Sequence, residues 1–171
     1  DTAIYSGNRS DYTVTENANG TYTVVDNRSG SPDGTDTVVG VENFRFADGD
    51  ILAGDLVAKD ISAVSDTDGS SNSIAENAGA GSTVGVTAFA DDANTSDSVT
   101  YAVDDDRFTV DENGVVTVAN GASFNYETET EITITVTATS TDGSTSQESF
   151  TLDVMDVAED LQLSGGGATF T

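Results

Sequence analysis

Three acidic segments that lie far apart in the sequence carry the residues best suited to chemistry in this chain. They are centred on Glu76 (residues 74–77, IAEN), Glu127 (126–127, YE) and Asp156 (156–160, DVAED). Each lies just before, between or after runs that read as β-strands, and a β-sandwich gathers such loops at one end. Carboxylate oxygens are preferred ligands of Ca²⁺. Because the chain has no His and no Cys, the sequence predicts an oxygen-ligand site for a hard cation.

The net charge of the chain limits the classes of partner that it can bind. Its 171 residues include 31 Asp and Glu but only 5 Lys and Arg, for a formal net charge of -26. Nucleic acids and anionic membrane surfaces are bound through basic side chains, so the composition argues against both. Two interpretations of the acidic residues stay open, and they are compatible: a solvated surface suited to salty surroundings, and a set of divalent-cation sites.

The composition also bears on compartment and catalysis. Without Cys the chain has no disulfides. If it is extracellular, its core and bound ions must therefore stabilise it. No apolar run is long enough to insert into a membrane. The chain begins without Met, and we expect an internal piece of a longer protein. Since neither His nor Cys is present as base or nucleophile, we predict that the chain is not an enzyme.

The elements that must position these carboxylates are predicted to be β-strands. No stretch keeps an apolar 3.6-residue period with helix caps. Residues 11–15 and 21–25 alternate on either side of the turn-rich stretch 16–20, which predicts a β-hairpin. Further strands are expected at 37–39, 44–46, 83–89, 98–103, 107–110, 115–118, 131–140 and 149–157.

The strands from residue 83 onward have the number and spacing of a sandwich. Alternation is strictest in residues 131–139, where Ile132, Ile134, Val136 and Ala138 are predicted to face the core. Asn113-Gly114 is a strong hairpin signal. About seven short strands in about a hundred residues are typical of an immunoglobulin-like fold. We therefore predict an all-β chain: a Greek-key β-sandwich with a smaller N-terminal β segment.

Composition also suggests how the chain is divided. A small β-rich segment is expected at 1–57, followed by a polar linker and domain start at 58–72. The sandwich is placed at 73–160, with a Gly-rich tail at 161–171. Some 55 residues without disulfides form a marginal core, so independent folding of the first segment stays open.

A series of short motifs follows one another in a set order over more than half of the chain. They are IAEN (74–77), FADD (89–92), VTY (99–101), FTVDENGVVTV (108–118), FNYE (124–127), VTATSTDG (136–143) and DVAE (156–159). In this order they resemble a bacterial cadherin-like domain, of the kind found in large secreted calcium-binding proteins and adhesins. YSGNRSDY (5–12), DGTDT (33–37) and VENFRFADG (41–49) resemble the region that flanks hemolysin-type (RTX) calcium-binding repeats.

The resemblance implies where calcium would bind. In cadherins, Ca²⁺ lies at domain junctions and stiffens the rod by neutralising carboxylates. The matching positions are Glu76, Glu127, Asp156 and Glu159 for one half of a junction, and Asp91, Asp92 and Asp142 for the other. The second half departs from the cadherin pattern at two points. Asp91 and Asp92 are adjacent, whereas the pattern has one residue between its two Asp, so Asp92 and Asn94 are an alternative pair. Ser140 occupies a position where the pattern has an Asp. We therefore expect the first half to be better formed.

The resemblance implies a calcium-stiffened structural or adhesion module of a large extracellular bacterial protein, secreted or at the cell surface. Its expected partners are neighbouring domains of the same protein, and a cell-surface protein or polysaccharide. The alternative is a calcium-dependent carbohydrate-binding module, which needs an exposed aromatic platform, whereas the strand pattern predicts Tyr101 and Tyr126 to be buried. A third interpretation is an acidic spacer that binds no specific ion.

Overall fold

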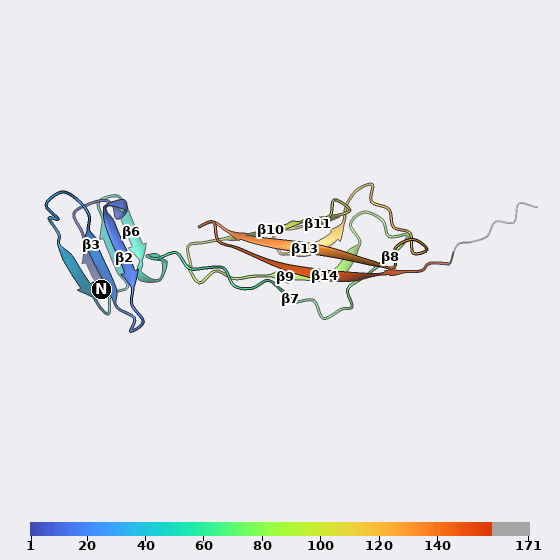
Figure 1. Ribbon diagram of the computed structural model, residues 1–171, viewed down its shortest axis with the longest axis horizontal. Coiled ribbons are helices and arrows are strands. Elements are labelled where there is room, and N and C mark those ends of the chain that lie inside the picture. Colours follow the sequence, from blue (N-terminus) through green and yellow to red (C-terminus); the bar gives the residue numbers. More distant parts are fainter. Residues whose placement is uncertain (159–171) are drawn as a thin grey trace, which may run out of the picture. The chain divides into compact units, whose positions relative to one another are not determined.

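The computed structural model describes residues 1–158 and confirms the all-β prediction (Figure 1). The N-terminal segment holds two three-stranded sheets, with strand orders β1-β5-β6 and β2-β3-β4. Its elements are β1 (Thr2–Ile4), the 3-10 turn η1 (Arg9–Asp11), β2 (Tyr12–Glu16), β3 (Tyr22–Asp26), β4 (Thr35–Val38), β5 (Asn43–Phe46), β6 (Gly49–Leu52) and the 3-10 turn η2 (Ala53–Asp55).

The predicted N-terminal hairpin is β2–β3, and its register runs from Tyr12 opposite Asp26 to Glu16 opposite Tyr22. Strand β6 was not predicted, because the stretch 47–50 (ADGD) reads as a turn. Antiparallel pairing with β5, which sets Phe46 opposite Gly49, overrides that local preference.

Aromatic side chains build the core of the N-terminal segment. Tyr5, Tyr12, Phe44 and Phe46 are buried in one cluster with Val24 and Leu56. The ring centroids of Tyr5 lie 5.1 Å from Tyr12 and 5.6 Å from Phe46. Burial, with the charge of Asp36 second, raises the pKa of Tyr5 to about 12. Large aromatic rings let a short segment without disulfides bury substantial apolar area.

Two four-stranded sheets make up the predicted sandwich, with orders β10-β13-β14-β8 and β11-β12-β9-β7. Figure 1 shows the long arrows of β13 and β14 side by side. The strands are β7 (Ser65–Asp66), β8 (Ser73–Ala75), β9 (Thr83–Phe89), β10 (Val99–Val103), β11 (Phe108–Val110), β12 (Val115–Val118), β13 (Glu131–Ser140) and β14 (Thr145–Met155).

The buried residues follow the predicted alternation. Ile132, Ile134, Val136 and Ala138 on β13 are at most 2% exposed, as expected from the 131–139 pattern. Strand β14 begins at Thr145 rather than at Ser149, because the turn at 140–144 closes with a hydrogen bond from the Ser140 N–H to the Ser144 carbonyl, and the chain re-enters the sheet immediately afterwards.

The chain groups into two compact units. Of the described residues, the first contains 1–65, 89–101 and 137–147, and the second contains 66–88, 102–136 and 148–158. The division into 1–57, 58–72 and 73–160 stays a prediction, and the Gly-rich tail at 161–171 lies outside the described residues. Within residues 1–158, no helix is long and apolar enough to cross a membrane.

Candidate metal centres

Three predicted ligands meet in a first acidic group, which we call the Glu76 cluster. Glu76, Glu127 and Asp156 each offer a carboxylate oxygen within 4.8 Å of the others. Glu76 follows β8 and Asp156 follows β14, and these strands pair in parallel with Ala75 opposite Met155. Glu127 comes from the turn that precedes β13. The parallel pairing thus brings together ligands from distant parts of the sequence.

Glu76 connects the two segments that carry the other carboxylates. Its Oε1 accepts a hydrogen bond from the Val157 N–H at 2.8 Å, and its Oε2 accepts one from the Tyr126 N–H at 3.0 Å. Val157 is adjacent to Asp156, and Tyr126 is adjacent to Glu127. The two backbone donors, with Val157 the stronger, hold the pKa of Glu76 below its ordinary value. The cluster is therefore assembled by backbone hydrogen bonds of the chain itself.

This hydrogen bonding predicts acid sensitivity at Glu76. A carboxyl whose pKa is lowered by folding contributes stability above its unfolded pKa of 4.5, and that contribution is lost as the pH falls through the lowered value. We expect Glu76→Gln to unfold more easily at neutral pH and to lose less stability on acidification than the wild type. Urea unfolding in chelator from about pH 7 to about pH 3 measures this. Glu112→Gln, at an exposed hairpin residue, is the control, and equal pH slopes for Glu76→Gln and wild type would contradict the prediction.

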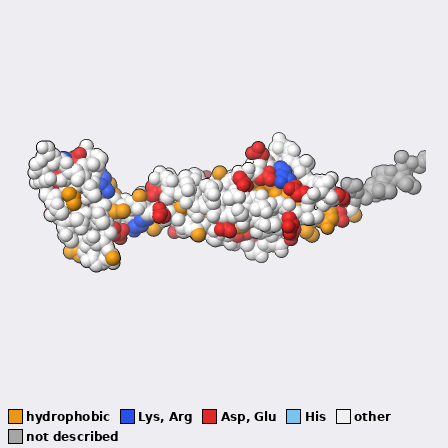
Figure 2. Space-filling model, viewed as in Figure 1, with side chains coloured by type: hydrophobic (Ala, Val, Ile, Leu, Met, Phe, Trp, Pro, Cys, Tyr) orange, Lys and Arg blue, Asp and Glu red, His pale blue; other side chains and the backbone are white. Residues whose placement is uncertain are grey.

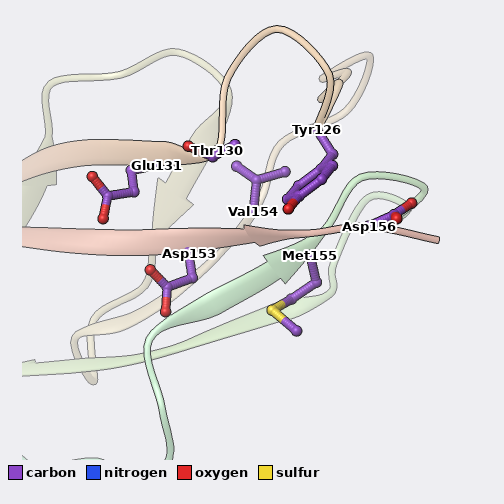
Figure 3. Close-up of a pocket in the computed structure, with 7 residues that line it drawn as sticks. All are labelled: Tyr126, Thr130, Glu131, Asp153, Val154, Met155 and Asp156. Atoms are coloured by element: carbon purple, nitrogen blue, oxygen red, sulfur yellow. The ribbon is translucent and has the colours of Figure 1, made fainter.

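An open cavity of about 410 Å³ adjoins the cluster at Asp156 (Figure 3). Its lining consists of Tyr126, Thr130, Glu131, Asp153, Val154, Met155 and Asp156. Figure 3 shows the Tyr126 ring directed from its loop toward β14, with the carboxylates of Glu131 and Asp153 farther along. Tyr126 and Tyr101 are half-buried rather than buried, since Tyr126 lies in a loop and Tyr101 extends its hydroxyl to the Ala90 N–H at 3.0 Å.

A second acidic group, the Asp92 cluster, contains Asp92, Asp97 and Asp142, whose carboxylate oxygens also lie within 4.8 Å of one another. Asp92 and Asp142 were predicted ligands, whereas Asp97 was not. The run DDANTSD at 91–97 ends with its third Asp, two residues before β10 begins, and that spacing is the signal that could have identified Asp97. Asp91 is exposed and is not in this group, while its neighbour Asp92 is buried.

The Asp92 carboxylate has one oxygen without a partner. Asp92 is 8% exposed; its Oδ1 accepts a hydrogen bond from the Asn94 N–H at 2.8 Å. Its Oδ2 is buried without a hydrogen-bond partner among residues 1–158, and the same is true of the Ser140 hydroxyl. An unpaired buried carboxylate oxygen is costly. Asp97 accepts a hydrogen bond from the Thr141 hydroxyl at 2.6 Å, and the Ser144 N–H lowers the pKa of Asp142.

Both clusters fit a hard cation by their chemistry. Each offers three carboxylates, and Ca²⁺ takes six to eight oxygen ligands from side chains, backbone and water. The Asp92 Oδ2, which has no hydrogen-bond partner among residues 1–158, is free to bind a cation. Figure 2 shows acidic side chains spread over the visible face, with basic ones at few places. The remaining predicted ligand, Glu159, lies outside the described residues.

Several acidic residues outside the two clusters are paired with groups of the chain itself. Asp105 forms an ion pair with Arg107 at 2.7 Å. Asp104 accepts a hydrogen bond from the Thr135 N–H at 2.7 Å. Asp66, the last residue of β7, accepts hydrogen bonds from the backbone N–H groups of Asp68 and Thr87, at 3.0 Å each, which gives its carboxylate a structural role.

Solved structures resemble this chain, although no protein-family model and no curated protein sequence matches it. The protocadherin GammaB4 extracellular domain aligns with a TM-score of 0.50 at 18% sequence identity. The chain has a cadherin-like fold. At this identity the likeness shows the fold alone. The alignment covers 85% of the chain but 25% of the protocadherin domain, so the cadherin-like chain spans about a quarter of that structure.

Two further cadherin structures align at lower TM-scores. Drosophila N-cadherin EC1-3 has a TM-score of 0.48 and 17% identity over 92% of this chain and 65% of its own. Mouse Cadherin-23 EC22-24 has a TM-score of 0.46 and 21% identity over 86% of this chain and 43% of its own.

Proposed function

We propose that this chain is a calcium-binding, cadherin-like structural and adhesion module rather than an enzyme. The observation that carries the proposal is the Glu76 cluster, in which three carboxylates from three separate loops converge within 4.8 Å. The cadherin-like fold supports it, because cadherin-like domains are commonly calcium-binding adhesion modules. The Asp92 cluster, with its unpaired buried oxygen, is the second proposed site.

In this proposal the residues of the Glu76 cluster have two roles. Glu76 keeps the segments of Tyr126 and Val157 together through its two backbone hydrogen bonds. Glu127 and Asp156 present exposed carboxylates that would hold the ion. Bound Ca²⁺ supplies the positive charge that removes repulsion between these groups. Loops joined by a common ion cannot separate freely, and the result is a stiffer module.

We further propose an extracellular setting. Cadherin domains are typically extracellular, and the motifs at 1–55 resemble regions that flank RTX repeats in large bacterial proteins, secreted or at the cell surface. The partners would be neighbouring domains of the same protein and a cell-surface protein or polysaccharide. With a net charge of -26, neither nucleic acid nor an anionic membrane is an expected partner, and we expect no membrane insertion.

A second function, calcium-dependent polysaccharide binding, is favoured by one specific feature. The cavity beside Asp156 combines the half-buried ring of Tyr126 with carboxylates and the Thr130 side chain, which suit the faces and hydroxyls of a sugar. Glycan screening in calcium and in chelator tests it. Calcium-dependent binding that Tyr126→Ala abolishes would support this function, and an absence of glycan binding in calcium would count against it.

Calorimetric titration with Ca²⁺ tests the main proposal, with Mg²⁺ as the competing ion. We expect selective Ca²⁺ binding at two sites. Glu127→Gln should remove the site at the Glu76 cluster, and Asp142→Asn should remove the site at the Asp92 cluster, because each loses a charged ligand. Glu112→Gln, in the exposed hairpin, should bind like the wild type. Equal responses to Ca²⁺ and Mg²⁺ would refute the calcium proposal and favour an acidic spacer.

A further inference from the structure

A single buried amide side chain holds the segment that follows β6. Asn94 is 2% exposed, and its Nδ2 donates hydrogen bonds to the Gly54 carbonyl at 2.8 Å and the Val57 carbonyl at 3.0 Å. Its Oδ1 accepts a hydrogen bond from the Lys59 N–H at 2.7 Å. Residues 54–59 and Asn94 belong to the same compact unit. One side chain thus binds three backbone groups within six residues of a non-strand segment.

Every polar atom of this amide has a partner. An Asn side chain offers two N–H donors and one acceptor oxygen, and all three functions are used. Nearby contacts act in the same direction: Asp55 Oδ1 accepts a hydrogen bond from the Thr95 N–H at 2.6 Å, and the Ser62 N–H donates to the Asp91 carbonyl at 2.8 Å. A satisfied buried polar network rigidifies its surroundings, whereas a partly satisfied one is destabilising.

We propose that Asn94 is a metal-independent lock on residues 54–59. Carbonyl oxygens gathered at one point are commonly held by a cation. Here the Asn94 NH₂ group holds two carbonyls and needs no ion. This goes beyond the proposed calcium sites, whose ligands are carboxylates: the backbone N–H of Asn94 donates to Asp92 Oδ1, but its side-chain amide is used entirely by residues 54–59. The order of residues 54–59 therefore persists when calcium is removed, and it depends on the donor capacity of residue 94 rather than on its size.

Lys59 allows a direct test, because it is the only lysine in the chain and lies within the locked segment. A lysine-specific protease therefore has one cleavage site. In chelator, we expect the wild type to be cut slowly, at a rate that added calcium changes less than about twofold. Asn94→Asp has nearly the same shape but presents a carboxylate that cannot donate to the Gly54 and Val57 carbonyls, so cleavage should be at least about tenfold faster. Asn94→Ala should behave in the same way, and Asn113→Ala, in an exposed turn, should match the wild type.

Cleavage of Asn94→Asp at the wild-type rate in chelator would overturn the lock. If the Asn94 variants do not fold, amide hydrogen exchange of the wild type in chelator tests whether Asn94 holds residues 54–59 without calcium. The Lys59 N–H donates to Asn94 Oδ1, so its exchange should be slowed at least about tenfold relative to an unstructured peptide. Exchange at the unstructured rate would also overturn the lock. Both measurements are made without calcium, so failure of the proposed calcium sites leaves their outcome unchanged.

Discussion

Saturating calcium is expected to raise the free energy of unfolding by about 2.7 kcal/mol for each independent site, at a free ion concentration of about 100 times Kd. The ion binds carboxylates that the native loops hold within 4.8 Å, whereas the unfolded chain does not keep them together. If the Glu76 and Asp92 clusters bind independently, the two contributions add. Urea unfolding followed by circular dichroism, in chelator and with stepwise Ca²⁺ or Mg²⁺, measures the effect.

Matched variants separate the two clusters in this experiment. Glu127→Gln and Asp142→Asn should each remove one part of the calcium-dependent gain, and the double variant should remove nearly all of it. Glu112→Gln keeps both clusters intact and should show the full gain. A double variant that still gains the full free energy would place the stabilising ions elsewhere on the chain. If calcium leaves the free energy of unfolding of the wild type unchanged, an acidic spacer that binds no specific ion explains the sequence better.

Replacing Gly114 by Ala is expected to destabilise the chain by roughly 2–6 kcal/mol, from about 1–3 kcal/mol of left-handed backbone strain and about 1–3 kcal/mol of overpacking. Gly114 has a φ of 79°, and a Cβ there would lie 1.8 Å from the Ala88 carbonyl oxygen. The neighbouring backbone cannot easily withdraw, because the Ala88 N–H donates to the Gly114 carbonyl at 2.9 Å. The midpoint of urea unfolding, at constant calcium, measures the loss.

Gly121→Ala is the matched control for that substitution. Gly121 has a similar φ of 84°, but a Cβ there would meet no atom within 4 Å. It should therefore cost only the backbone strain, about 1–3 kcal/mol. The difference between the two variants isolates the clash with Ala88. Equal losses for Gly114→Ala and Gly121→Ala would show that the contact relaxes and that the expected overpacking is absent.

Local patterns explain why much of the fold was predictable. The alternation in 131–139 was sufficient to assign the buried face of β13, because side chains of a strand point alternately to its two faces. The repeated alternation around residues 16–20 was sufficient for the β2–β3 hairpin, since its register depends on a short turn. Strand β6 was not predicted, because Asp48, Gly49 and Asp50 favour a turn. The strand forms there because it pairs with β5.

The sequence identified some, but not all, of the acidic residues that the structure brings together. Glu76, Glu127 and Asp156 stood out because each lies beside a predicted strand and oxygen is the ligand type that this chain offers in abundance. Asp97 was not predicted, although it ends the acidic run 91–97, because only the folded chain brings its carboxylate close to those of Asp92 and Asp142. Asp91 was equally acidic, yet it is exposed and lies outside the cluster.

The sequence by itself determined that this is an all-β chain in which any bound metal must be held by oxygen atoms, because strand alternation is a local property and His and Cys are absent. The tertiary structure alone decided which groups meet. The hydrogen bonds of Glu76 join residues 50 and 81 positions apart, and those of Asn94 reach residues 35 to 40 positions away. Such pairs depend on strand order and register, which no local pattern specifies.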